Sequence, residues 1–84
     1  MDDFSNIRDV IDMWPTRAVL ADEMSAILEV AGGRVTGEQV HKWAQKAAIP
    51  ARFHQTLLEA ARRRGFPVTA DVIVRLHHLQ RAAA

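Results

Sequence analysis

The chain has 84 residues, of which 49% are hydrophobic and 25% are charged, and it contains no cysteine. This composition is typical of one folded domain spanning residues 1–84, and it excludes disulfides, zinc–thiolate sites and bulk disorder. No apolar run approaches the roughly 18 residues of a membrane span. The acidic start Met1-Asp2-Asp3 differs from the basic start of a secretory signal. We therefore expect a cytoplasmic protein.

The net charge of +1 conceals an uneven distribution along the chain. Residues 1–33 carry two arginines against seven carboxylates, a net −5, whereas residues 34–84 carry nine lysines and arginines against three carboxylates, a net +6. Such an asymmetry is expected when one side of a protein meets phosphates. Chance segregation of charges on helix surfaces is the alternative explanation.

Five segments have apolar residues at helical spacing and none alternates like a strand, so the sequence predicts an all-α fold of about five short helices. The first helix is predicted at residues 6–14, because Pro15 disfavours a helical conformation in the residue before it. Thr16 is placed to cap the second helix, which ends at Gly32-Gly33. The predicted buried positions are Ile7, Val10, Ile11 and Trp14 in the first helix, and Leu20, Met24, Ile27, Leu28 and Ala31 in the second.

Residues 35–50 contain the clearest helix signals. Thr36 and Gln39 have the spacing of a capping box, and Val35 and Val40 have that of a hydrophobic staple. The predicted buried stripe is Val40, Trp43, Ala44 and Ala47. The opposite face carries long hydrogen-bonding side chains, namely Glu38, Gln39, His41, Lys42, Gln45 and Lys46. A helix of this kind after a Gly-Gly turn is typical of the recognition helix of a helix-turn-helix formed by the second and third helices.

Two more helices complete the predicted fold. Pro50 suits the first turn of the fourth helix, which ends at Gly65 after three arginines. Thr69 is placed to cap the fifth helix, and the tail from Arg81 is expected to fray. The predicted inward positions are Phe53, Leu57, Leu58 and Ala61 in the fourth helix, and Val72, Ile73, Leu76 and Leu79 in the fifth. With Val74 added, the fifth helix has more apolar side chains than one stripe needs, so it is the candidate for a dimer contact.

Three segments carry a family resemblance. They are residues 14–21 (WPTRAVLA), Val35-Thr36 followed by Val40 and Trp43, and Ile49-Pro50 followed by residues 58–65 (LEAARRRG). Together they resemble the Cro/repressor-like (lambda-repressor-like) helix-turn-helix regulators, particularly short alphaproteobacterial and prophage members, over roughly residues 7–80. Thirteen residues separate Ala21 from Val35. We therefore expect either a second helix about two turns longer than is usual in the family, or a looser turn at residues 32–34.

The resemblance implies that the first half of the third helix enters the major groove of DNA. There Gln39 would read adenine, Lys42 would read guanine or bind phosphate, and Glu38 would accept from cytosine. Arginines beside this helix would bind the phosphate backbone. The expected DNA-binding residues are Arg17, Arg34, Thr36, Gly37, Glu38, Gln39, His41, Lys42, Lys46 and Arg52. A solvated helix face with ordinary surface arginines is the alternative.

No catalytic or metal site is predicted. His77 and His78 are adjacent, so on a helix they point about 100° apart and do not chelate as an i, i+4 pair would. His41 and His54 lie on different helices. Ser5 and Ser25 have no evident base partner. We therefore expect no cofactor and no enzymatic activity.

The sequence thus predicts a sequence-specific DNA-binding transcriptional regulator of phage or prophage type. It would act as a homodimer on double-stranded DNA, and it would be nucleoid-associated when bound. The alternative is a small helical protein-interaction module, an adaptor or antitoxin-like partner that uses its acidic first half to bind a basic protein.

Overall fold

The computed structural model describes residues 4–83, and it describes side chains for residues 4–79. The described helices are α1 (Ile7–Ile11), α2 (Arg17–Leu28), α3 (Gly37–Lys46), α4 (His54–Arg64) and α5 (Ala70–Ala83), with two short 3₁₀ segments, η1 (Glu29–Ala31) and η2 (Ala51–Phe53). None of the residues in this range is in a β-strand, and the predicted all-α class is confirmed. In the same range, no helix combines the length and apolar character needed to cross a membrane.

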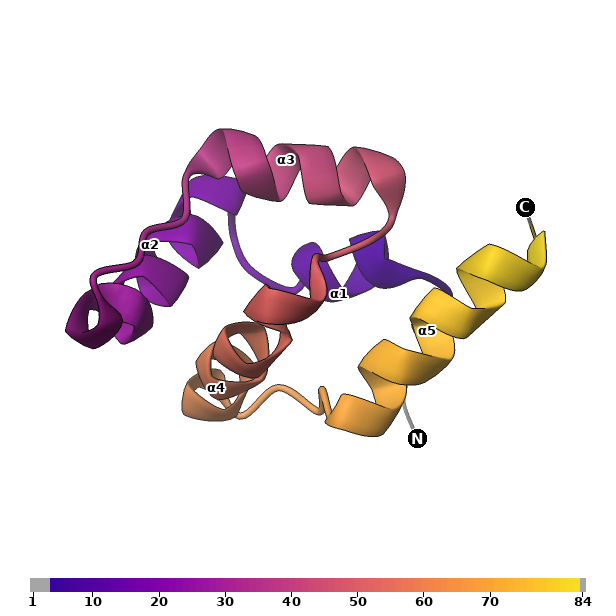
Figure 1. The fold of residues 1–84 in the computed structure, drawn as a ribbon. Helices are drawn as coiled ribbons and strands as arrows, with labels where there is room; N and C mark the ends of the chain where they lie inside the picture. Colours follow the sequence, from indigo (N-terminus) through magenta and orange to yellow (C-terminus); the bar gives the residue numbers. More distant parts are fainter. Residues whose placement is uncertain (1–3, 84) are drawn as a thin grey trace.

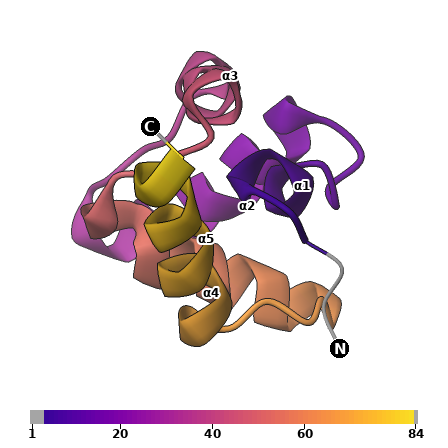
Figure 2. The ribbon, with the colours of Figure 1, turned by 90° about the vertical axis from the view of Figure 1, so that its right-hand side faces the viewer.

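Helix α3 lies along one side of the molecule (Figure 1) and packs mainly against α1 and α2. Helix α2 also packs on α4, and α5 packs on α1 and α4. In Figure 2, which is turned by 90°, α3 and α4 lie at opposite ends of the molecule. The face of α3 that is turned away from α1 and α2 is therefore left uncovered.

The core is built from apolar side chains of all five helices. The largest of the fully buried side chains, each less than 2% exposed, are Ile7, Val10, Ile11, Leu20, Met24, Val40, Leu57, Ile73 and Leu76. Each such burial stabilises the fold by roughly 1.5–3 kcal/mol. Trp14 and Trp43 are 3% and 6% exposed, which confirms both as core residues. Ile27, Leu28 and Leu58 are only partly buried against this core.

Three other residues that the sequence predicts to be in the core are not buried. Ala31 is exposed, because α2 gives way to the tighter 3₁₀ turn η1 before the Gly-Gly pair and the apolar stripe loses its phase. Ala47 is half-buried, because the helix has already ended and Ala47 takes a left-handed conformation with φ 53°. Leu79 is 48% exposed, because the C-terminal end of α5 extends away from α4 (Figure 1). The tail that was expected to fray from Arg81 is helical through Ala83.

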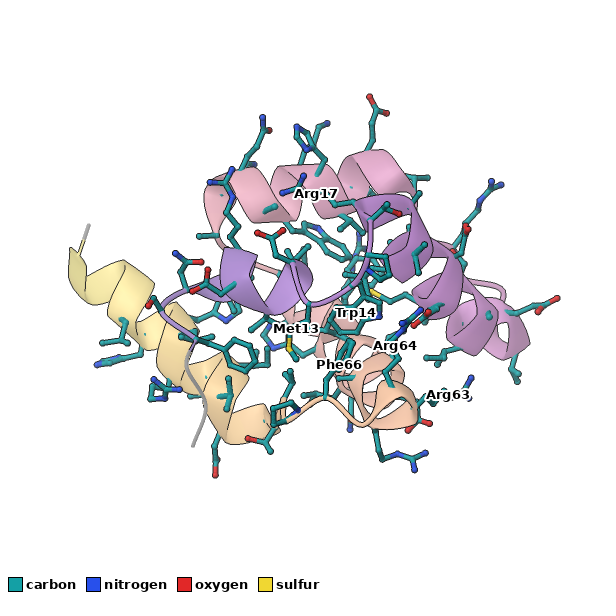
Figure 3. All side chains as sticks on the ribbon, turned by 180° about the vertical axis from the view of Figure 1, so that it is seen from behind. Met13, Trp14, Arg17, Arg63, Arg64 and Phe66 are labelled. Carbon is teal, nitrogen blue, oxygen red and sulfur yellow. The ribbon has the colours of Figure 1, made fainter. Side chains whose placement is uncertain are left out.

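The first helix is shorter than predicted, because the chain leaves the helical path before Pro15. Trp14 instead packs edge-on against Phe66, with ring centroids 5.0 Å apart, and its indole Nε1 donates to Glu23 Oε1 at 2.9 Å. Arg64 binds the same carboxylate from the end of α4. Figure 3 shows this cluster, which ties the α1–α2 turn to the end of α4.

The fourth helix starts later than predicted. Pro50 has an extended ψ of 139°, and the 3₁₀ turn of η2 follows it before α4 begins at His54. This turn places Phe53 against Trp43, with ring centroids 5.1 Å apart. The end of α4 is as predicted, because Gly65 takes the left-handed conformation at φ 73° that favours glycine.

Candidate nucleic-acid interface

The start of α3 has the capping box that the sequence predicts. The Thr36 hydroxyl accepts from the Gln39 N–H at 3.2 Å, and Gln39 Oε1 accepts from the Thr36 N–H at 2.9 Å. The staple residues Val35 and Val40 are 3% and 0% exposed. A Cβ added to Gly37 would lie 3.8 Å from Ala18 Cα, so the first turn of α3 lies directly against the first turn of α2. The helix start is thereby fixed in position before any ligand binds.

Gln39 is occupied by this cap. A two-atom contact with adenine uses both the amide oxygen and the amide nitrogen of a glutamine. The oxygen of Gln39 already accepts the Thr36 N–H, and the residue is half-buried. An adenine contact would therefore use an amide oxygen that already accepts one hydrogen bond, on a half-buried side chain, and Lys42 is the more accessible of the two side chains.

The outer face of α3 is polar and exposed. Val40, Trp43 and Ala44 are buried, whereas the exposed residues of this helix are Glu38, His41, Lys42, Gln45 and Lys46. With 100° between successive residues, Glu38, Lys42 and Gln45 lie opposite the buried stripe, and His41 and Lys46 lie to either side of them. Figure 3 shows long side chains projecting from α3 away from the other helices.

Arg17 lies beside this face, at the first position of α2. Figure 3 places it against α3. Its Nη2 is 3.5 Å from Asp12 Oδ1, and its side chain is 34% exposed. Its Nε is buried and has no hydrogen-bond partner among the described residues. A cation at a helix N-terminus opposes the helix dipole, so the position of Arg17 is not explained by the stability of α2.

Arg34, Gln39 and Arg52 come together on the other side of α3, although they belong to three separate segments. With Leu28, Gly33 and Phe53 they line a hollow of about 360 Å³. The Arg52 guanidinium lies 4.8 Å from the centroid of the Phe53 ring, and that ring is itself held against Trp43. Packing below the surface therefore positions Arg52 next to α3.

A second basic cluster, Arg62, Arg63 and Arg64, is paired internally with two carboxylates, which leaves it a net +1. Arg62 and Arg63 both bind Glu59, and their hydrogen bonds hold the pKa of Glu59 below its ordinary value. Arg64 binds Glu23 and lowers the pKa of that carboxyl in the same way. Figure 3 places Arg63 and Arg64 at the end of α4, away from α3. These arginines thus contribute little positive charge to the α3 surface.

Ser25 has a structural role that the sequence analysis missed. Its hydroxyl donates to the Val35 carbonyl at 2.8 Å and accepts from the Val35 N–H at 2.9 Å. This pair of bonds ties the α2–α3 connection back onto α2. The connection combines both expected alternatives, since η1 lengthens α2 and Gly32, at φ 76°, begins a non-helical stretch through Thr36. A serine in mid-helix, where its hydroxyl competes with the backbone, was the available signal.

No catalytic arrangement or metal centre emerges from the described side chains. Ser25 is hydrogen-bonded to backbone on both sides, and within residues 4–79 no group of three or more His, Asp or Glu side chains is placed to hold a metal ion. His54 and His77 lie together, but they are bonded to the backbone of Ile49.

No protein-family model, curated protein or solved structure matches this chain. A function for the α3 surface therefore depends on its own geometry and chemistry.

Proposed function

We propose that this protein binds double-stranded DNA in a sequence-specific manner, with α3 in the major groove, and that it acts as a transcriptional regulator of the Cro/repressor-like type. The observation that carries the proposal is the exposed polar face of α3 with arginines beside it. Arg17 lies near the start of α3, next to Ala18, which packs against Gly37, and Arg34 and Arg52 line the hollow beside Gln39. A helix in the major groove needs this arrangement, because a phosphate backbone runs along each side of the groove.

The dimensions and charge of the surface suit that ligand. Ten residues make α3 about 15 Å long, and the major groove is about 12 Å wide and 8.5 Å deep. Five cations, Arg17, Arg34, Lys42, Lys46 and Arg52, belong to this surface, against the two carboxylates of Glu38 and of Asp12, which lies beside Arg17; these seven residues sum to a net +3. Lys42, at the centre of the exposed face, is the residue we propose for base contact, and the three arginines are proposed for phosphate contact.

Selection of bound duplexes from a random library, at about 0.15 M salt, tests the proposal. We expect an enriched motif that is lost with Lys42→Ala, because a base contact carries specificity. Folded protein that enriches no sequence would refute the proposed function. Lys42 is preferable to Gln39 for this test, since Gln39 also caps α3.

The phosphate contacts are tested by the salt dependence of affinity for the selected duplex. Changing Arg34 and Arg52 together to glutamine should weaken binding to every sequence, and it should lower the slope of log K against log salt by about two, roughly one for each lost contact. The matched control changes Arg62 and Arg63 to glutamine, which removes the same charge at the Glu59 cluster. Equal losses from the two double variants would show only a general effect of net charge.

We further propose that the protein binds DNA as a homodimer through α5. One recognition helix gives a small interface, and a two-fold symmetric site doubles it. Val74 and Leu79 on α5 are 65% and 48% exposed. We expect a dimer in sedimentation at about 100 μM, a concentration that populates a dimer with a Kd of about 10 μM or less, and a monomer with Val74→Ser and Leu79→Ser. A monomeric wild type, with and without DNA, would contradict this proposal.

A protein-interaction module is the second candidate function, and one observation favours it. Val30 is 98% exposed in η1, at the far end of α2 from α3. Two carboxylates of the acidic first half, Asp9 and Asp12, are partly engaged, since Asp9 accepts the Ser5 N–H and Asp12 lies next to Arg17. Val30→Ser discriminates between the candidates. It should leave DNA selection unchanged, and on the alternative it should abolish capture of the protein partner.

A further inference from the structure

Two histidines form hydrogen bonds with the backbone of Ile49, which lies in the connection (residues 47–50) between α3 and η2. The Ile49 N–H donates to Nε2 of His77 on α5 at 3.0 Å. The Ile49 carbonyl accepts from Nε2 of His54 on α4 at 2.7 Å. The two imidazole rings are 5.0 Å apart between centroids, and Ile49 itself is 3% exposed. The backbone of one buried residue thus depends on imidazoles from two other helices.

These contacts assign the protons on each ring. Nε2 of His77 accepts a hydrogen bond, so it carries no proton. Nδ1 of His77 lies 2.8 Å from the Ile73 carbonyl, which only accepts, so Nδ1 carries the proton. His77 must therefore be neutral for the contact with Ile49 to exist. His54 only donates to the Ile49 carbonyl, and it can do so in its neutral or its charged form.

We propose that His77 is a pH-operated latch that holds α5 against the connection between α3 and α4. The latch is closed when His77 is neutral. Protonation gives the imidazole ring a second N–H, at Nε2. This N–H is directed at the Ile49 N–H, so a hydrogen bond is replaced by a clash between two donors. A charge on His54, 5.0 Å away between ring centroids, adds repulsion. The hydrogen bond to Ile49 exists only with a neutral His77, so protonation of this ring is the event that opens the latch.

Among the described residues that line the hollow beside His77, none is an acid that could compensate an imidazolium. His77 faces this hollow of about 300 Å³, lined by Ile49, Ala51, His54, Val74, His77 and His78, in which the only titratable side chains are the three histidines. The helices packed around His77 also carry charged residues, but none of these residues lines the hollow. They are Arg8 and Asp9 on α1, Glu59 and Arg62–Arg64 on α4, and Asp71 and Arg75 on α5. Helix α5 packs mainly on α1 and α4, and loss of the Ile49 contact removes a hydrogen bond that joins it to the α3–α4 connection.

Nuclear magnetic resonance on the complete chain tests the latch independently of DNA binding. Long-range ¹H–¹⁵N correlations at pH 8 should show His77 as the Nδ1–H tautomer and His54 with a proton on Nε2. The same spectra, recorded as the pH is lowered from 8 to 5, report the protonation of His77. The exchange protection factors of the Ile49 amide and of α5 should then fall by at least about tenfold relative to α2, as expected when one buried donor loses its acceptor.

Two variants sharpen the test. His77→Gln should weaken the protection of Ile49 at both pH values and remove its pH dependence, whereas His78→Gln, on the exposed side of the same helix, should keep the wild-type response. The tautomer measurement on the unaltered chain tests the latch even if His77→Gln does not fold. The proposal is overturned by a proton on Nε2 of His77 at pH 8, by a His77 that stays neutral at pH 5, or by Ile49 protection that survives its protonation.

Discussion

Replacing Ser25 with alanine should destabilise the fold through the α2–α3 connection. The hydroxyl bonds both the N–H and the carbonyl of Val35, a residue that is 3% exposed. Removal of the hydroxyl leaves the Val35 N–H and carbonyl without their partner, and each group then lowers the free energy of unfolding by about 1 kcal/mol, the low end of the range for buried groups. The low end is appropriate because these hydrogen bonds are only part-buried. Alanine regains about 0.5 kcal/mol of helix propensity, so the net loss is about 1.5 kcal/mol.

The free energy of unfolding in urea, followed by tryptophan fluorescence, measures this loss. For a domain of this size a change of about 1.5 kcal/mol lowers Tm by roughly 6–12 °C. The matched control is Ser5→Ala, since Ser5 is exposed and its hydroxyl is not part of this connection; we expect a change within about 0.5 kcal/mol. A loss below about 0.5 kcal/mol for Ser25→Ala would refute the reasoning, because it would mean that water replaces both hydrogen bonds without penalty.

Three further changes test other parts of the structure. Ala47→Gly should raise the free energy of unfolding by about 1 kcal/mol, because alanine is strained in the left-handed conformation. Ala26→Gly, at an exposed position within α2, should lower the free energy of unfolding by a similar amount. Changes of the same sign for both variants in urea denaturation would contradict the assignment of strain to Ala47. Thr36→Ala should lower the free energy of unfolding by about 1 kcal/mol, because α3 loses its side-chain cap. An unchanged urea midpoint would show that Gln39 alone suffices to cap α3. Arg64 holds the pKa of Glu23 below its ordinary value of 4.5, so the ionised carboxylate stabilises the fold above about pH 4.5 and this contribution is lost as the pH falls below that value. The stability difference between wild type and Glu23→Gln should therefore shrink between pH 6 and pH 3, and a constant difference would argue against the pairing.

The helices and most of the core were predictable because their signals are local. The capping box of Thr36 and Gln39, the Thr16 and Thr69 caps and the glycine at position 65 act within one turn of their own helix, and each is found as predicted. The errors have two causes, a partner outside the helix at Trp14 and an unusual backbone conformation at Ala47. Trp14 leaves its helix to meet Glu23 and Phe66, and Ala47 ends α3 in a conformation that alanine seldom adopts.

The candidate DNA-binding residues divide in the same way. Glu38, His41, Lys42 and Lys46 were placed on one exposed face by helical periodicity alone, and the structure keeps them there. The grouping of Arg34 and Arg52 with Gln39 joins segments that no local pattern connects. The use of Gln39 as a cap rather than as a free amide was implicit in the spacing, but only the hydrogen bond to the Thr36 N–H establishes it.

The sequence by itself determined an all-helical domain with a polar, exposed third helix, because periodicity and capping are written within a few consecutive residues. Only the tertiary structure decided which charges are available to a ligand. Arg62, Arg63 and Arg64 are bound to Glu59 and Glu23, whereas Arg34 and Arg52 meet beside Gln39 of α3. The physical reason is that ion pairs and packing contacts such as Arg64 with Glu23, 41 residues apart in the chain, form only once the helices have come together.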